Sequence, residues 1–185
     1  MLRVGSKSRL QKSDHLRAVR CWLSFFIAGL ILSGVTAFPL EAELHWLLLV
    51  LHTGVLRQAA EYTHLRPWIT RVYDALSMTN KQYPFLAYGT DWLAFAHLVI
   101  AVAFLGPYRD PVRNKWVITF GLFACAGVIP LALIAGPIRG IPIAWRLIDC
   151  SFGVIGAIPL LLCRWHVLAL ENLEQASIYP HTPSV

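Results

Sequence analysis

Long runs of apolar residues, separated by short polar stretches, set the pattern of this chain. Four of the runs have the length that a helix needs to cross the roughly 30 Å hydrocarbon core of a bilayer. They occupy residues 21–40, 91–107, 116–136 and 141–163. The pattern predicts an all-α fold, a polytopic integral membrane helical bundle with about four transmembrane helices in a single domain.

A shorter apolar run, Leu44–Leu56, follows the first predicted span and is interrupted by His45 and His52. As a helix, its 13 residues would cover about 20 Å, which is too little for the hydrocarbon core. We therefore expect this run to lie in the membrane interface or to pack on the bundle. A fifth span is the alternative.

The next segment, Leu65–Leu76, has the period of an amphipathic helix, and Pro67 suits its first turn. Its apolar residues recur at i, i+3, i+4 and i+7, while its polar residues take the opposite side. The segment predicts a helix that lies on the membrane surface or packs on an adjacent helix, so that interfacial helices fill residues 41–83. The apolar positions are Leu65, Trp68, Ile69, Val72, Tyr73 and Leu76.

Both terminal segments are expected to lie outside the bundle. Six of the 16 Lys and Arg residues fall within residues 1–20, which predicts a poorly ordered, cytoplasmic N-terminal segment under the positive-inside rule. Residues 164–185 predict a C-terminal surface helix and a loose tail.

The number of spans decides how the chain is oriented in the membrane. Four spans put ten basic residues on the cytoplasmic side and five on the other, whereas five spans give eleven against four. The distribution of charge therefore does not distinguish four spans from five. The short length of Leu44–Leu56 favours four spans. We expect a multi-pass protein of a bacterial cytoplasmic (inner) membrane with a cytoplasmic N-terminus.

The composition narrows the classes of function. The chain is 57% hydrophobic and 14% charged, whereas soluble domains carry about 25% charged residues. The net charge of +6 fits the orientation signal and does not indicate a nucleic-acid partner. No CxxC pair occurs among the four cysteines, so the sequence favours neither a disulfide framework nor a zinc site.

An aromatic cluster precedes the second span, at the point where the chain would enter the membrane. Pro84 and Gly89 predict a structured turn there, and Asp91 suits the start of a helix, either as a cap or in the first turn. The aromatic residues are Tyr83, Phe85, Tyr88 and Trp92.

Polar residues of different spans are predicted to share one depth in the membrane. The second and fourth spans enter from the same side, which puts His97 about 9 Å deep, Arg146 about 7–8 Å and Asp149 about 12 Å. The antiparallel third span brings Pro130 to about 9 Å from the same face. This layer lies near the non-cytoplasmic face.

The fourth span carries its two charges on a face with glycines. Arg146, Asp149, Gly153 and Gly156 follow i, i+3, i+7 and i+10, which is one side of a helix. Glycines there permit close helix packing, so the face is expected to point into the bundle. At i and i+3 the two charges can also pair with each other.

Two kinds of function fit this layer. In one, the charges lock helices together, and the chain is an assembly subunit or a bundle that binds a lipid or another amphiphile. In the other, the chain is an intramembrane enzyme for a lipid, isoprenoid or quinone-like substrate. His97 and Asp149 would then be the acid and base, Arg146 would hold an anionic head group, and binding at the rim would fall to Asp91, Tyr88 and Trp92.

The expected partners are the bilayer, an amphiphilic small molecule, and further copies or other subunits. A transporter would need more spans or a repeat, so four helices would have to form a homo- or hetero-oligomer. His45 and His52 lie about 10 Å apart along a helix, too far to share one metal ion, and the closer Glu41 and His45 need ligands from elsewhere. We predict no metal site and no cofactor.

Overall fold

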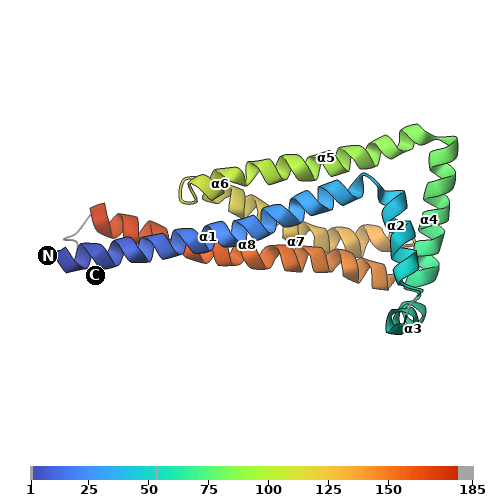
Figure 1. Cartoon of the computed structure of the whole chain (residues 1–185), viewed down its shortest axis with the longest axis horizontal. Coiled ribbons are helices and arrows are strands. Elements are labelled where there is room, and N and C mark those ends of the chain that lie inside the picture. The colour runs from blue at the N-terminus through green and yellow to red at the C-terminus, as the bar shows by residue number, and fades with distance from the viewer. Residues whose placement is uncertain (1, 53, 179–185) are drawn as a thin grey trace.

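Four long helices lie alongside one another and form the body of the protein (Figure 1). The fold is described from a computed structural model, which covers residues 2–52 and 54–178. Within these residues four helical stretches are long and apolar enough to cross a membrane, which confirms the predicted all-α, multi-pass fold. The long helices are α1 (Leu2–Ala37), α5 (Tyr88–Ala103), α7 (Lys115–Ile138) and α8 (Ile143–Ile178).

The four helices pack in the spatial order α5, α1, α8, α7. α1 therefore lies between α5 and α8. α5 and α7 come together where the short helix α6 (Leu105–Arg109) joins them, and they diverge toward the other end of the bundle (Figure 1). The order matters for function, because it decides which polar side chains can meet.

The main apolar core lies where all four long helices are close to one another. Phe104, which follows α5, is fully buried and its ring centroid lies 4.7 Å from that of Phe26 on α1. Gly121 on α7 leaves the space that Phe104 and Leu160 of α8 fill, since a Cβ there would lie 2.7 Å and 2.8 Å from these side chains. The core is therefore close to α6 and away from the end where α5 and α7 diverge.

Three short helices, together called the cap, cover the other end of the bundle (Figure 1). They are α2 (Leu40–Val50), α3 (Gly54–Tyr62) and α4 (Leu65–Gln82), and a 3-10 turn, η1 (Pro84–Ala87), leads from α4 into α5. α2 and α4 lie across the direction of the long helices. The run Leu44–Leu56 is thus broken into two short helices and is not a fifth span.

The cap has an apolar core of its own. Ile69 of α4 is buried with Leu44 and Leu51 of the α2 segment and Ala60 of α3, and Trp145 of α8 packs against this cluster. The period that predicted an amphipathic helix from Leu65 accounts for this arrangement, because its apolar positions face α2. Burial of that face joins the cap to the bundle.

A tight turn sets α8 antiparallel to α7. The backbone N–H of Ile141 donates to the Gly136 carbonyl at 2.9 Å, and that of Gly140 to the Pro137 carbonyl at 3.0 Å. These are the two bonds of a Schellman cap. Gly140 has a φ of +69°, a left-handed conformation that glycine adopts without steric cost.

Residues 2–20, expected to be poorly ordered, are helical and continuous with the first span. The C-terminal helix is likewise no separate surface element, because α8 runs unbroken through residue 164 to Ile178. At about 54 Å each, both helices exceed the hydrocarbon thickness. The predicted loose tail falls on residues 179–185, which lie outside the described residues.

The parts of α1 and α8 that extend beyond the bundle pack against each other as an antiparallel pair. We call this pair the stalk; it comprises residues 10–20 of α1 and 164–176 of α8. Val19 is buried with Val167 and Leu170, and Lys12 forms an ion pair with Glu174 at 2.8 Å. His15 and His166 approach at 2.9 Å between their Nδ1 atoms. The structure differs here from the expectation of a poorly ordered N-terminal segment. A short polar helix is unstable alone, and packing against a partner helix orders it.

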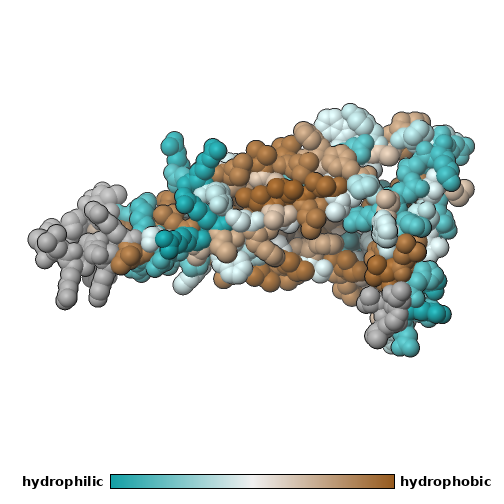
Figure 2. All heavy atoms as spheres, viewed as in Figure 1, coloured by the Kyte–Doolittle hydropathy of each residue, from teal (hydrophilic) through white to brown (hydrophobic). Residues whose placement is uncertain are grey.

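The surface agrees with a membrane position. Figure 2 shows an apolar band over the middle of the bundle, with hydrophilic residues toward the stalk and over much of the cap. Exposed Phe, Leu, Ile and Val side chains of the long helices form this band. It would face lipid, and the two ends of the bundle, the stalk end and the cap end, would lie at the two membrane surfaces.

The close packing of α8 on α7 predicts a steric effect at Gly153. A Cβ there would lie 2.5 Å from the Cys125 carbonyl oxygen, so Gly153→Ala must push the helices apart. We expect a loss of about 1–3 kcal/mol in stability, measured as a lower thermal unfolding midpoint in detergent. Gly127→Ala, on α7 with nothing within 4 Å of the new Cβ, is the matched control. Equal midpoints for the two variants would contradict the packing.

Candidate functional site

His97 lies on α5 at the contact with α1. Its Nδ1 donates to the Leu93 carbonyl at 2.8 Å, within the same helix. Its Cβ lies close to Gly34 of α1, where an added Cβ would be 3.2 Å away. One ring nitrogen is thus used by the helix backbone, which is the usual way for a histidine in an apolar helix to satisfy a polar atom.

Arg146 and Asp149 do not form the pair that their spacing allowed. The Arg146 side chain lies over Gly136 of α7, so its atoms run toward the neighbouring helix and not along α8. Its Nε is buried without a hydrogen-bond partner. Among the described residues no ion pair joins the two charges. The arginine stem instead occupies the gap left by Gly136.

The predicted layer is divided between two sides of α1. His97 belongs to α5, whereas Arg146 and Asp149 belong to α8, and α1 packs between these helices. In the described part of the chain, no hydrogen bond or ion pair connects His97 with either charge. The three residues share one end of the bundle but are not joined into one polar cluster.

The glycines of α8 take the position that the sequence predicted. An added Cβ on Gly153 would meet the Cys125 backbone of α7, and one on Gly156 would lie 3.1 Å from the Cys125 Sγ and 3.4 Å from Phe26 of α1. This face of α8 is therefore lined by protein on both sides, in agreement with the prediction that it points into the bundle.

The three rim candidates lie in the first turns of α5. Asp91 is in the first turn, as expected for a carboxylate near a helix start, and is partly buried. The Tyr88 and Trp92 rings meet edge to face with centroids 5.9 Å apart, and Phe95 continues the row. All three rings are exposed. They form an aromatic surface on α5.

A pocket of about 570 Å³ opens at the cap end, between the end of α1, helices α2 and α4, and the start of α5. We call it the cap pocket. Its lining mixes polar groups with apolar and aromatic groups. The polar lining residues are Glu41, His45, Tyr73, Asn80 and Thr90, and the larger apolar ones are Phe38, Leu40, Trp46 and Leu76.

Glu41 is held in this pocket by α4. The Asn80 Nδ2 donates to the Glu41 Oε2 at 2.9 Å. This bond lowers the pKa of Glu41 below its ordinary value, and the Ser77 hydroxyl and the charge of Lys81 add to the effect. Glu41 is therefore a carboxylate at neutral pH, since hydrogen bonds to the charged form favour it.

The same pair leaves an acceptor without a partner. The Asn80 Oδ1 is buried and has no hydrogen bond, although buried carbonyl oxygens are rarely left unpaired. Close by, the His45 ring lies against Tyr73 at 5.8 Å between centroids. The pocket thus offers a carboxylate and aromatic rings, which suit a head group that donates hydrogen bonds or carries positive charge.

Sequence reasoning missed this pocket because its parts come from separate helices. Glu41 and His45 were considered as metal ligands, but Tyr73 and Asn80 were not connected with them. The structure has no cluster of three His, Cys, Asp or Glu residues suited to a metal ion within the described ranges. One feature of the sequence could have indicated the pocket. Asn80 is a polar residue in the last turn of the helix whose apolar face had been predicted from Leu65 onward.

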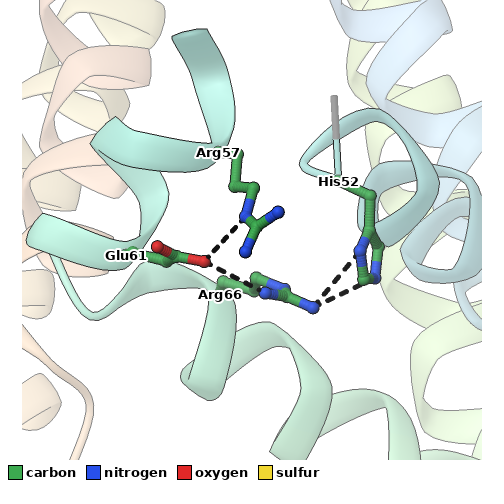
Figure 3. A network of polar contacts seen from close by, with 4 residues as sticks. All are labelled: His52, Arg57, Glu61 and Arg66. Carbon is green, nitrogen blue, oxygen red and sulfur yellow. Dashed lines mark hydrogen bonds and ion pairs between the residues drawn. The ribbon is translucent and has the colours of Figure 1, made fainter. Parts of the chain in front are cut away.

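A second polar network joins α3, α4 and the turn that follows α2 (Figure 3). Glu61 of α3 accepts hydrogen bonds from Arg57 at 3.1 Å and from Arg66 of α4 at 3.3 Å, and Arg66 reaches the ring of His52 at 3.2 Å. The bond from Arg57 lowers the pKa of Glu61. The network is exposed, so it stabilises the cap modestly and fixes how α3 meets α4.

Comparison with known proteins adds no relative. No family model, no curated protein and no solved structure matches the chain. The cap pocket is therefore the feature from which we infer a function.

The Asn80–Glu41 bond predicts a pH effect. Asn80→Ala should raise the pKa of Glu41 toward its ordinary value of 4.5, observed by carbon-13 NMR of the carboxyl group. A depressed pKa stabilises the fold above the unfolded-state pKa, and this contribution is lost as the pH falls through the folded-state pKa. The difference in unfolding midpoint between wild type and Asn80→Ala should thus be largest at neutral pH and narrow below pH 4.5.

Thr79→Ala, a neighbouring change on α4 that does not touch the pocket, is the control and should leave the pKa of Glu41 unchanged. The assignment of the bond fails if Asn80→Ala and Thr79→Ala give the same pKa.

Proposed function

We propose that the protein binds an amphiphile whose head group carries a protonated amine or comparable hydrogen-bond donors, and that the head group enters the cap pocket. The observation that carries this proposal is the Glu41–Asn80 pair, which holds a carboxylate in the lining of the pocket. This is the lipid- or amphiphile-binding form of the function expected from the sequence.

The chemistry of the pocket supports a cationic or donating head. The Glu41 carboxylate would supply the opposite charge, and the rings of Tyr73 and Trp46 a surface for cation–π contact. An anionic head group would instead face the carboxylate.

The position of the pocket supports an amphiphile over a water-soluble ligand. Two apolar residues of the lining, Phe38 and Trp46, are 47% and 67% exposed, and Phe38 directly follows the end of α1. A head group in the pocket could keep its tail along these side chains. The volume of about 570 Å³ is in the usual range for small-molecule sites.

The same proposal assigns a place in the cell. The cap would lie on the non-cytoplasmic surface of a bacterial inner membrane, with α4 as an amphipathic helix in the interface. The stalk, with its basic N-terminal residues, would lie in the cytoplasm. Ten basic residues at the stalk end against five at the cap end support this orientation through the positive-inside rule.

An intramembrane enzyme built on His97 and Asp149 has less support. Such a reaction would need both groups to reach one substrate, whereas they belong to helices that are separated by α1. One nitrogen of His97 is also bonded to the Leu93 carbonyl. Without a hydrogen bond or ion pair between these candidates, binding is the simpler function.

Ligand binding can be tested with alkyl chains that differ only in the head group. Purified full-length protein in a mild detergent is mixed with hexadecylamine, hexadecan-1-ol or hexadecanoic acid, and bound molecules are counted by native mass spectrometry. Hexadecylamine should bind at one site, more tightly than the alcohol, and the acid should bind least. Glu41→Gln should weaken hexadecylamine binding at least tenfold, because it removes the charge and keeps the shape.

Glu43→Gln is the matched control. Glu43 is exposed in the same first turn of α2 but does not line the pocket, so this variant should bind as wild type does. Equal binding of hexadecanoic acid, or equal losses for Glu41→Gln and Glu43→Gln, would overturn the proposal.

The orientation has its own test. Lys81→Cys in the last turn of α4 and Arg113→Cys in the linker between α6 and α7 are made in a variant whose native cysteines are alanine. A membrane-impermeant maleimide should label Lys81→Cys on spheroplasts, and Arg113→Cys only after lysis. The reverse pattern would invert the proposed topology, and labelling of both on intact spheroplasts would contradict it.

A further inference from the structure

A second groove lies at the opposite end of the bundle, between the first turn of α7 and the part of α8 that leaves the apolar band. It has a volume of about 340 Å³, and we call it the basic groove. α7 contributes Lys115, Trp116 and Thr119, and α8 contributes Arg164, Leu168 and Glu171. Its chemistry is the inverse of that of the cap pocket.

The charges of the groove are arranged in two levels. The Arg164 Nη1 donates to the Thr119 Oγ1 at 3.3 Å. One helical turn further out, the Lys115 Nζ lies 2.6 Å from Glu171 Oε1. Lys115 keeps 61% of its side chain exposed while Glu171 keeps 18%, so the accessible charge is positive. The groove carries two cations and one covered carboxylate.

The groove is at the depth where lipid head groups would lie. Arg164 is the first charged residue after the apolar run that ends at Cys163, and Lys115 directly precedes the apolar run of α7. Trp116 and Trp165 are both exposed at this level, as aromatic residues are at a membrane interface. Cations at this depth are within reach of a phosphate.

An apolar surface continues from the groove toward the middle of the bundle. Trp116, Phe120 and Phe123 follow i, i+4 and i+7 on α7, and Leu161, Arg164 and Leu168 follow i, i+3 and i+7 on α8, so each set shares one helix face. All the apolar members of both sets are exposed. A ligand that fits both parts has a negatively charged head and a long apolar tail.

We propose that the basic groove binds one anionic phospholipid, with its phosphate between Lys115 and Arg164 and its acyl chains along Phe120, Phe123 and Leu161. Free phosphate shares the head-group chemistry, but it would leave the adjoining apolar faces uncovered. Other basic residues at the stalk end would add attraction for an anionic leaflet. The proposal is independent of the cap pocket, because it concerns the other membrane surface.

The test is the thermal unfolding midpoint of the purified full-length protein in detergent, titrated with dioleoylphosphatidylglycerol, dioleoylphosphatidylcholine or inorganic phosphate. A ligand that binds the folded state raises the midpoint in a saturable manner. We expect a saturable rise with phosphatidylglycerol, a rise at least fivefold smaller with phosphatidylcholine at equal concentration, and no rise with millimolar phosphate.

Variants distinguish the groove from general surface charge. Arg164→Gln and Lys115→Gln should each lower the apparent affinity for phosphatidylglycerol at least fivefold, and Arg164→Lys should recover part of the loss because it restores the charge. Arg113→Gln, an exposed cation at the same end but outside the groove, should bind as wild type does. Lys115→Gln removes an exposed side chain, so it tests the site even if Arg164→Gln unfolds.

Three results would overturn the proposal. Equal losses for Arg113→Gln and the groove variants would mean that only the overall surface potential attracts the lipid. An equal rise with phosphatidylcholine would remove the role of head-group charge. A full effect of inorganic phosphate alone would make the site an anion site that has no need of the lipid tail.

Discussion

The close contact of α8 with α7 on one side and α1 on the other is the interaction on which the rest of the structure depends. Gly153 and Gly156 bring α8 against the Cys125 backbone and side chain and against Phe26, and the Schellman turn at Gly140 sets the antiparallel start. In lipid, helices gain no hydrophobic energy from touching, so close van der Waals packing of this kind must hold them. α1 and α8 continue beyond the bundle as the stalk, where each helix orders the other.

This packing also explains why the polar groups are separated. With α1 between α5 and α8, His97 and the two charges of α8 lie on different sides of one helix. Arg146 fills the space left by Gly136 of α7, which favours a structural role for it in the α7–α8 contact. The polar groups that a ligand could reach lie at the two ends of the bundle, in the cap pocket and in the basic groove.

The two ends differ in chemistry. The cap pocket presents the Glu41 carboxylate, whereas the basic groove presents Lys115 and Arg164. Both adjoin exposed aromatic residues at the edge of the apolar band. An amphiphilic ligand at one surface and an anionic lipid at the other would each find a complementary head-group site.

The sequence by itself determined the class of fold, the four spans and the position of residues 41–83 outside them. Apolar run length and helical period are local properties of the sequence. They decide directly which segments partition into lipid and which helix face is buried. The inward face of Gly153 and Gly156 followed from the same period. What only the tertiary structure decided was which polar groups meet. Arg146 turned to α7 and not to Asp149, residues 2–20 became helical through α8, and Asn80 reached Glu41 from a helix 39 positions away. Each of these depends on the neighbour that packing supplies, and helical period carries no information about that neighbour.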